Sequence, residues 1–222
     1  MAHVTTREPT RTARRKAATE AAIVAAGERL FHERGFRDAR IEDLAEAADV
    51  AVGSIYAHFG SKLGLFLEVV ERALSTQEAL LLEIHARCEP ADSKLRALGE
   101  AFVAFAVEHP SKFRLLSEGP LTPARPADAD LARRIDQMSR RGQVLIDRLA
   151  ATIDEGIEAG ILRAVDAQRS ARFLWAAWSG ALALHLRHDR LGATDPRELR
   201  AIVQQGTDLV THGLMAASPP AR

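Results

Sequence analysis

Residues 40–62 read RIEDLAEAADVAVGSIYAHFGSK. Apolar residues recur at helical spacing through 40–48 and again through 52–59, and the three residues between these segments are expected to form a tight turn. Asp49 is a residue type that tolerates a positive φ angle, and Val50 is expected to fill the space between the two helices. Two short helices joined by such a turn are typical of a DNA-reading helix-turn-helix.

The second of these helices carries the residue types that read DNA. An α-helix fits the major groove, where residues near its N-terminus meet base edges and phosphates. Gly53 would permit close approach, Val52 and Ala57 would offer apolar contact to a thymine methyl, and the Tyr56 hydroxyl would reach a base or a phosphate. The alternative is that Tyr56 caps the core of an ordinary helix pair. We expect these residues to contact DNA: Arg40, Ala51, Val52, Gly53, Ser54, Tyr56, Ala57, His58 and Lys62.

The rest of the chain has a helical period almost everywhere. Strand patterns are nearly absent, and Ala, Leu, Glu and Arg dominate. The sequence therefore predicts an all-α protein with an N-terminal three-helix domain and a larger helical domain after it. The expected parts are a flexible basic arm at 1–15, a helix-turn-helix domain at 16–62, a helical domain at 63–217 and a disordered tail at 218–222.

Several helix ends can be predicted from their terminal residues. The first helix, 12–34, is expected to stop at Gly35 in a positive-φ conformation, with Phe36 packed on Phe31. Asp92 or Ser93 is a candidate N-cap for the fifth helix. The other expected end signals are Ser61 and Asp166 as N-caps, Asp195-Pro196 as a helix start, and Gly142 and Gly156 as points where the long helix 128–160 bends or breaks.

Composition and charge limit the classes of function. The 222 residues have zero net charge and are 47% apolar, which is ordinary for a globular protein. Residues 1–16 carry five bases and one acid, so this segment can follow DNA phosphates, although a merely solubilising terminus is as good an interpretation. Cys88 is the only cysteine, and the chain has neither a signal-peptide pattern nor an apolar run of about 20 residues. We therefore expect a cytoplasmic location.

No catalytic or metal-binding motif stands out in the sequence. Glu83, His85 and Cys88 lack a second pair of ligands at metal spacing. HExxH, GxSxG, CxxC and phosphate-loop patterns are missing from the sequence. The expectation is a protein that is not an enzyme and uses no cofactor.

The segment from the first helix to Lys62 resembles the DNA-binding domain of TetR (tetracycline-repressor-like) regulators. The resemblance rests on Gly35-Phe36, on Ile41-x-x-Leu44-Ala45-x-x-Ala48-x-Val50 and on Gly53-Ser-Ile-Tyr56-x-His58-Phe59-x-x-Lys62. It implies that Tyr56, His58 and Lys62 contact DNA and that a homodimer binds a palindromic operator. Arg40, Asp49 and Ala51 depart from the family pattern, which usually has Thr or Ser, Gly, and Ser there. These departures bear on the operator sequence.

The last two helices carry apolar stripes that suit a symmetric interface between two chains, as the resemblance also implies. The alternative is that both stripes face only their own domain. The expected interface residues are Leu182, His185, Leu199, Ile202, Val203, Gly206, Leu209, Val210 and Gly213.

The larger domain is expected to enclose a ligand pocket. His109 or His185 would be its polar handle. An aromatic residue on a helix is more often core than pocket wall, so each wall residue has a competing interpretation. The expected wall is Phe102, Phe105, Phe113, Leu116, Met138, Leu145, Trp175 and Trp178.

These features together predict a DNA-binding transcriptional regulator, most simply a repressor released from a palindromic operator by a small apolar effector. The expected partners are duplex DNA, the effector and a second copy of the chain. Two alternatives remain: an activator with the same fold, and an effector-independent helical dimer that binds another protein.

Overall fold

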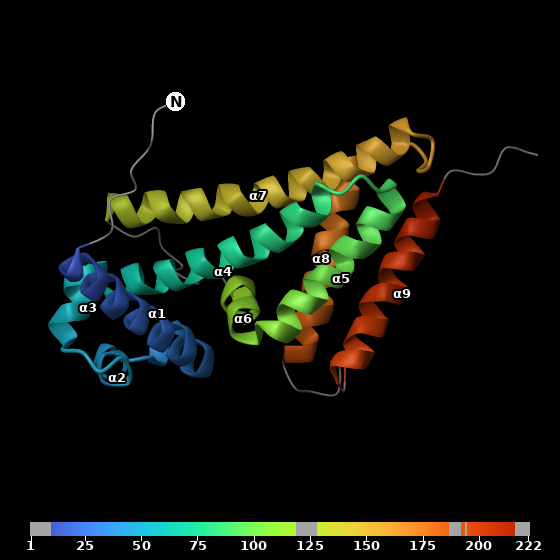
Figure 1. The fold of residues 1–222 in the computed structure, drawn as a ribbon. Coiled ribbons are helices and arrows are strands. Elements are labelled where there is room, and N and C mark those ends of the chain that lie inside the picture. The colour runs from blue at the N-terminus through green and yellow to red at the C-terminus, as the bar shows by residue number, and fades with distance from the viewer. Residues whose placement is uncertain (1–9, 119–127, 187–191, 194, 216–222) are drawn as a thin grey trace, which may run out of the picture. The chain divides into compact units, whose positions relative to one another are not determined.

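The structure is a computed structural model that describes residues 10–118, 128–186, 192–193 and 195–215 (Figure 1). The predicted all-α class is confirmed: apart from an isolated bridge between Leu162 and Met215, the described residues form helices and no strand. None of these helices is both long and apolar enough to cross a membrane. The helices are α1 (Arg11–Asp38), α2 (Ile41–Ala47), α3 (Val52–Phe59), α4 (Lys62–His85), α5 (Ala91–Glu108), α6 (Pro110–Glu118), α7 (Ala129–Glu158), α8 (Ala167–Leu186) and α9 (Pro196–Leu214).

The chain divides into two compact units, residues 1–69 and 70–222. The division falls inside α4, whereas the sequence placed a boundary at the start of that helix. α4 is therefore one continuous helix that begins in the first unit and ends in the second.

Part of the expected flexible arm is helical. Thr10 is the N-cap of α1, where its hydroxyl accepts a hydrogen bond from the backbone N–H of Ala13 (3.2 Å). This cap and the alanine-rich sequence that follows start the helix at Arg11, one residue before the predicted start at 12, so residues 11–15 of the expected arm are helical. The expectations for 1–9 and 218–222 lie outside the described residues.

Three phenylalanine rings close the core of the first unit. The ring of Phe31 meets that of Phe66 edge-on at 5.2 Å between centroids, and Phe36 lies 6.1 Å from Phe31 and 4.9 Å from Phe66. Gly35, at φ 74°, reverses the chain so that Phe36 can fold back, which confirms the predicted contact. A side chain would be strained in that conformation.

The second unit is built around α5, which packs against α6, α7, α8 and α9 (Figure 1). Bidentate ion pairs join the second part of α4 to α7: Arg134 binds Glu71 at 2.8–3.0 Å, and Arg141 binds Glu78. The backbone N–H of Arg163 donates to the Leu214 carbonyl (2.7 Å), which fixes the end of α9.

The expected helix ends are mostly confirmed, with two corrections. Ser61, Asp166 and Asp195 each accept hydrogen bonds from the first turn that follows, as predicted. Pro90 rather than Asp92 or Ser93 is the N-cap of α5, since Asp92 lies in the first turn and pairs with Arg96. α7 continues through both Gly142 and Gly156, because the packing of its long apolar face outweighs the weak helix propensity of two glycines.

Candidate nucleic-acid interface and effector cavity

The turn between α2 and α3 fixes the orientation of α3. Asp49 has φ 53°, the positive value that the sequence predicted for it. The next N–H, that of Val50, donates to the Ala45 carbonyl (3.0 Å) and closes the turn. Leu44 of α2 and Ile55 of α3 are both fully buried, so the inner faces of the two helices are held by the core.

The outer face of α3 is open to solvent. Tyr56 has 49% of its surface exposed, and Gly53 and Ala57 are exposed beside it. A tyrosine that capped the core would be mostly buried, so this exposure argues against the structural alternative. Ala51 at the N-cap gives α3 no side-chain cap, which leaves N–H groups of its first turn available to an anion such as phosphate. Val52, Ser54 and His58 are half-buried at its margins.

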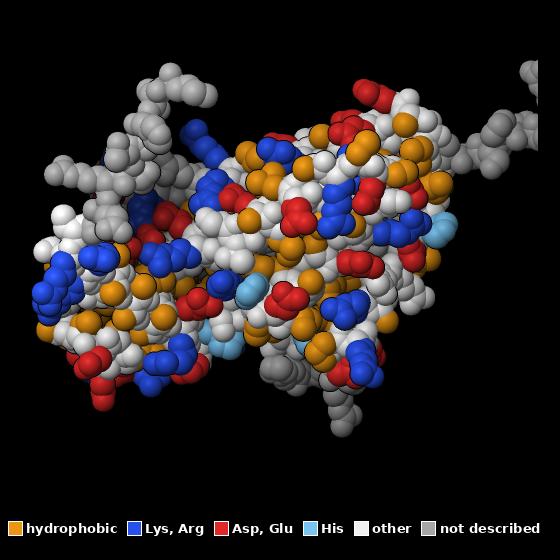
Figure 2. Space-filling view, in the orientation of Figure 1, with side chains coloured by type: hydrophobic (Ala, Val, Ile, Leu, Met, Phe, Trp, Pro, Cys, Tyr) orange, Lys and Arg blue, Asp and Glu red, His pale blue; other side chains and the backbone are white. Residues whose placement is uncertain are grey.

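The first unit carries exposed basic side chains outside α3. The Arg40 side chain is 75% exposed, and its nearest carboxylate, that of Glu42, is 3.7 Å away. α1 begins with exposed Arg11, Arg14, Arg15 and Lys16 before its first acidic residue, Glu20. Figure 2 shows Lys and Arg side chains on the surface of α1, whereas α3 itself contains neither residue type. This distribution suits a polyanion, although the chain as a whole is neutral.

Lys62 has a structural role that the sequence did not predict. Its ammonium donates to the carbonyls of Ala39 (2.9 Å) and Arg37 (3.2 Å), and lies 4.7 Å from the centre of the Phe36 ring. Two of its three N–H donors are therefore used within the chain. Lys62 stabilises the end of α1, and at most one donor remains for a phosphate.

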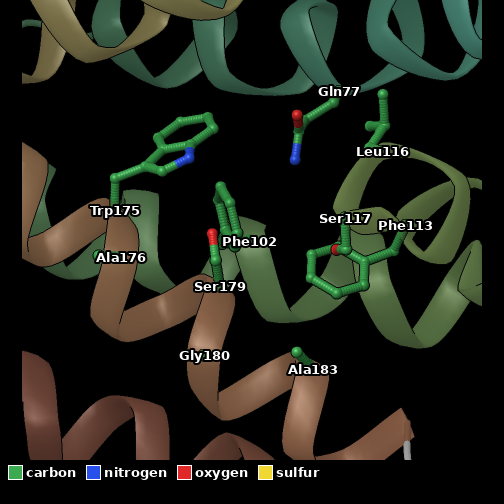
Figure 3. Close-up of a pocket in the computed structure, with 10 residues that line it drawn as sticks. All are labelled: Gln77, Phe102, Phe113, Leu116, Ser117, Trp175, Ala176, Ser179, Gly180 and Ala183. Carbon is green, nitrogen blue, oxygen red and sulfur yellow. The ribbon is translucent and has the colours of Figure 1, made fainter. Parts of the chain in front are cut away.

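The second unit contains a cavity of about 480 Å³ between α4, α5, α6 and α8 (Figure 3). This volume lies within the range of small-molecule sites. Phe102, Phe113 and Trp175 form its aromatic wall, with Phe102 and Trp175 edge-on at 4.8 Å between centroids. The described lining residues are Gln77, Phe102, Phe113, Leu116, Ser117, Trp175, Ala176, Ser179, Gly180 and Ala183.

Four of the eight expected wall residues line this cavity: Phe102, Phe113, Leu116 and Trp175. Trp178 and Leu145 instead border a much smaller void, because Trp178 donates from Nε1 to Thr207 Oγ1 (2.9 Å) and is drawn towards α9. Phe105 and Met138 are buried in the core and do not line the cavity. For Phe105 the alternative interpretation is therefore the right one: this aromatic residue belongs to the core and not to the cavity wall.

The expected histidine handles lie elsewhere. His185 Nδ1 bonds the Ala193 carbonyl (2.9 Å), and His109 packs against the ring of Phe105. The buried polar group of the cavity is Gln77, which was not predicted from the sequence. A signal was available, because Gln77 interrupts a stripe of α4 whose other members, Val70, Ala73, Leu74, Leu81 and Ile84, are all buried apolar residues. A polar side chain in a buried stripe normally has a hydrogen-bond partner, so this glutamine indicates a polar contact on that face of α4.

His85 lies close to this region but serves the fold. Its Nδ1 is 3.1 Å from Thr152 Oγ1. Burial lowers the pKa of His85 below its ordinary 6.5, Arg148 and Lys94 lower it further, and Glu155 opposes them. Within the described part of the chain, no group of three His, Cys, Asp or Glu side chains could hold a metal ion.

Several expected interface residues have no surface to offer another chain. Leu182, Leu199 and Val203 are 0%, 1% and 3% exposed because they pack in their own core, so their assignment to an intermolecular interface is corrected. His185 and Val210 are half-buried. The outward face of α9 carries Ile202, Gly206, Leu209 and Gly213, and Phe173 is exposed on α8.

The fold and these two sites can be compared with known proteins. PfmR of Thermus thermophilus, a TetR family regulator, superposes with a TM-score of 0.67 at 23% identity, over 89% of this chain and 99% of PfmR. The ketosteroid transcriptional regulator KstR2 of Mycobacterium tuberculosis gives 0.69 at 22% identity, over 89% and 95%. At this level of identity the likeness concerns the fold.

Sequence relatives cover shorter stretches. The transcriptional repressor BepR of Brucella suis is 38% identical over 73 residues, 33% of this chain and 35% of BepR. The transcriptional activator FasR of Mycolicibacterium smegmatis is 34% identical over 97 residues, 43% of each chain. The matches thus span about a third of one relative and less than half of the other.

Both units match a described family. Residues 23–69 match the family "Bacterial regulatory proteins, tetR family", and residues 95–210 match "Tetracyclin repressor-like, C-terminal domain". The second match alone covers more than half of the chain. The chain therefore belongs to the TetR family of bacterial regulatory proteins.

Proposed function

We propose that this protein is a sequence-specific transcriptional repressor that leaves a palindromic operator when a small, largely apolar effector binds. The observation that carries the proposal is the outer face of α3, where a half-exposed Tyr56 lies between exposed Gly53 and Ala57 on a helix anchored by buried Ile55. A rigid helix that presents such a face is the element that enters a major groove.

A homodimer supplies the symmetry that a palindromic operator requires. Leu209 is 70% exposed, Phe173 61% and Ile202 45%, on the two last helices of the chain. Large apolar side chains exposed on neighbouring helices favour an interface over open solvent. Symmetric pairing through α8 and α9 would bury them and place two copies of α3 on one operator.

Effector release would use α4, since this helix begins in the first unit and lines the cavity in the second. The two recognition helices of a dimer must match half-sites about one DNA turn apart, so a small displacement weakens both contacts. A coupling free energy of about 1–3 kcal/mol would lower operator affinity roughly 5- to 150-fold. The activator FasR favours a second candidate, an activator with the same binding chemistry.

The test is binding of the purified protein to DNA from upstream of its own coding region, measured over a range of salt concentrations. Tyr56→Ala should weaken operator binding by about 1–3 kcal/mol while sedimentation shows an unchanged dimer. Arg40→Ala should reduce the slope of the logarithm of the affinity against the logarithm of the salt concentration by about one, the value of one lost phosphate contact.

Arg140→Ala is the matched control, because it removes an exposed arginine from the second unit. It should leave both the affinity and its salt dependence as in the wild type. Equal operator affinity in the wild type and Tyr56→Ala would contradict the assignment of α3.

A further inference from the structure

Gln77 is the most buried polar residue that lines the effector cavity. The residue is 4% exposed, and Figure 3 shows its amide directed from α4 into the cavity. It forms no hydrogen bond with any other residue that the structure describes. Among the described residues, the only buried side-chain N or O atom without a partner is Thr211 Oγ1, so the Gln77 amide is not sealed from the space of the cavity and remains available to a hydrogen-bonding partner. The cavity is where such a partner would lie.

The lining of the cavity selects against charge. Its described residues are aromatic, aliphatic, glycine, serine and one glutamine, none of which carries a formal charge. An ionised ligand would lose its hydration there without gaining a counter-charge, which is strongly unfavourable. The cavity therefore fits a neutral molecule.

The aromatic wall selects for rings. Phe102 meets Trp175 edge-on at 4.8 Å and Phe113 edge-on at 6.1 Å, so three ring systems border one space. Aromatic pairs gain from edge-to-face and offset contacts in addition to the area they bury. Ser117 and Ser179 add hydroxyl groups at the margin, but the Gln77 amide offers both a donor and an acceptor.

Resting on the proposed regulator function, we propose that the effector is a neutral, ring-containing molecule with a hydrogen-bonding group that pairs with the Gln77 amide. The aromatic wall holds the rings, and the amide fixes their orientation. This bond is made to α4 itself, fifteen positions after its first residue, Lys62. Gln77 is thus the residue through which occupancy of the cavity reaches the helix shared with the DNA-binding unit.

The test uses two probes with one ring system. N-phenyl-1-naphthylamine is neutral and has a single N–H donor, and 8-anilinonaphthalene-1-sulfonate is the same molecule with an anionic group. Quenching of tryptophan fluorescence reports occupancy, since Trp175 lines the cavity and Trp178 contacts the Phe102 ring. The neutral probe should bind at least about tenfold more tightly than the anionic one.

Gln77→Leu should then weaken binding of the neutral probe roughly 3- to 10-fold, the value of one hydrogen bond. It should leave the melting temperature of the ligand-free protein unchanged or higher, since it replaces a polar side chain by an apolar one in a largely apolar lining. Gln77→Met is a second variant of similar size, should leucine fold poorly. Gln137→Leu makes the same change at an exposed position of α7 and should alter neither value.

Several results would overturn the inference: no quenching by the neutral probe, equal affinity for the two probes, or equal affinity of the wild type and Gln77→Leu. The last would mean that water satisfies the amide. Operator binding measured with the same neutral probe separates this inference from the proposed function. If the neutral probe binds in a Gln77-dependent way but leaves the operator complex intact, the ligand class stands and effector release is wrong. If the probe releases the wild type and Gln77→Leu from the operator equally, effector release stands and the role of Gln77 is wrong.

Discussion

The two units of the chain bury their side chains in contrasting ways. The first closes its core with the rings of Phe31, Phe36 and Phe66. The second leaves a cavity beside Phe102, and it holds all the buried polar and charged side chains of the described residues: Gln77, Lys94, Thr152, Thr207 and Thr211. A protein that reads DNA needs one fixed surface, whereas a ligand site needs unfilled volume and a free polar group. The first unit is thus built for rigidity and the second for adaptation.

The largest test of this contrast removes one phenylalanine ring from each unit. Phe31 and Phe102 are 1% and 2% exposed, so the deletions match in burial. Phe31→Ala should reduce the free energy of unfolding by about 3–5 kcal/mol, since it opens a void in a closed core. Phe102→Ala should cost less, because part of its ring already faces the cavity and has fewer contacts to lose.

Denaturant unfolding followed by circular dichroism measures both changes. Phe31→Ala should also abolish operator binding, and Phe102→Ala should preserve it. If Phe102→Ala proved as costly as Phe31→Ala, the cavity would be filled in solution and the contrast would fail.

A smaller effect is expected from glycine substitutions within the second unit. Outside the cavity this unit is tightly packed around Gly99. A Cβ atom at Gly99 would lie 2.9 Å from Thr207 Oγ1 and 3.3 Å from the Trp178 ring, next to the bond that joins these two side chains. Gly99→Ala should therefore destabilise the fold by about 1–3 kcal/mol. Gly142→Ala, with no neighbour within 4 Å, should stabilise it by roughly 0.5–1 kcal/mol. Chemical denaturation of the two variants should give shifts of opposite sign, and shifts of the same sign would contradict this packing.

The smallest effect concerns pH. The pKa of His85 is lowered in the folded protein, mainly by burial, so the unfolded chain binds a proton here more readily than the folded one. The free energy of unfolding should therefore fall as the pH drops below 6.5, and this contribution should stop changing once the pH is below the folded pKa. His85→Gln should flatten the pH dependence, measured as thermal stability between about pH 7 and pH 5. His32→Gln is a control at another half-buried histidine. An identical flattening in this variant would show that the pH dependence does not come from His85 in particular.

Local sequence was sufficient to predict most of the fold. Positive φ at Asp49, the kink that Gly35 makes in α1 and the caps at Ser61, Asp166 and Asp195 each follow from residues within a turn of one another. The continuity of α7 through Gly142 could not be predicted in this way, because it depends on packing between distant segments.

The candidate sites also differ in how far they depend on local sequence. The exposed face of α3 follows from a period of a few residues, so the exposure of Tyr56 and its neighbours could be predicted. The cavity wall depends on which rotation each helix adopts against its neighbours, so only part of it was predicted. Gln77 was missed although its place in an apolar stripe of α4 was a local signal. Lys62 shows a third case, a residue whose long side chain bonds carbonyls 23 and 25 positions earlier.

The position of Cys88 has a practical consequence. It is exposed, it is the only cysteine of the chain, and it lies three residues after α4 ends at His85. A nitroxide attached there needs no engineered cysteine and reports the far end of the helix that begins at Lys62. In a symmetric dimer the two labels would give one distance. Pulsed electron paramagnetic resonance of the wild-type sequence would therefore measure whether the ends of the two α4 helices move when an effector binds.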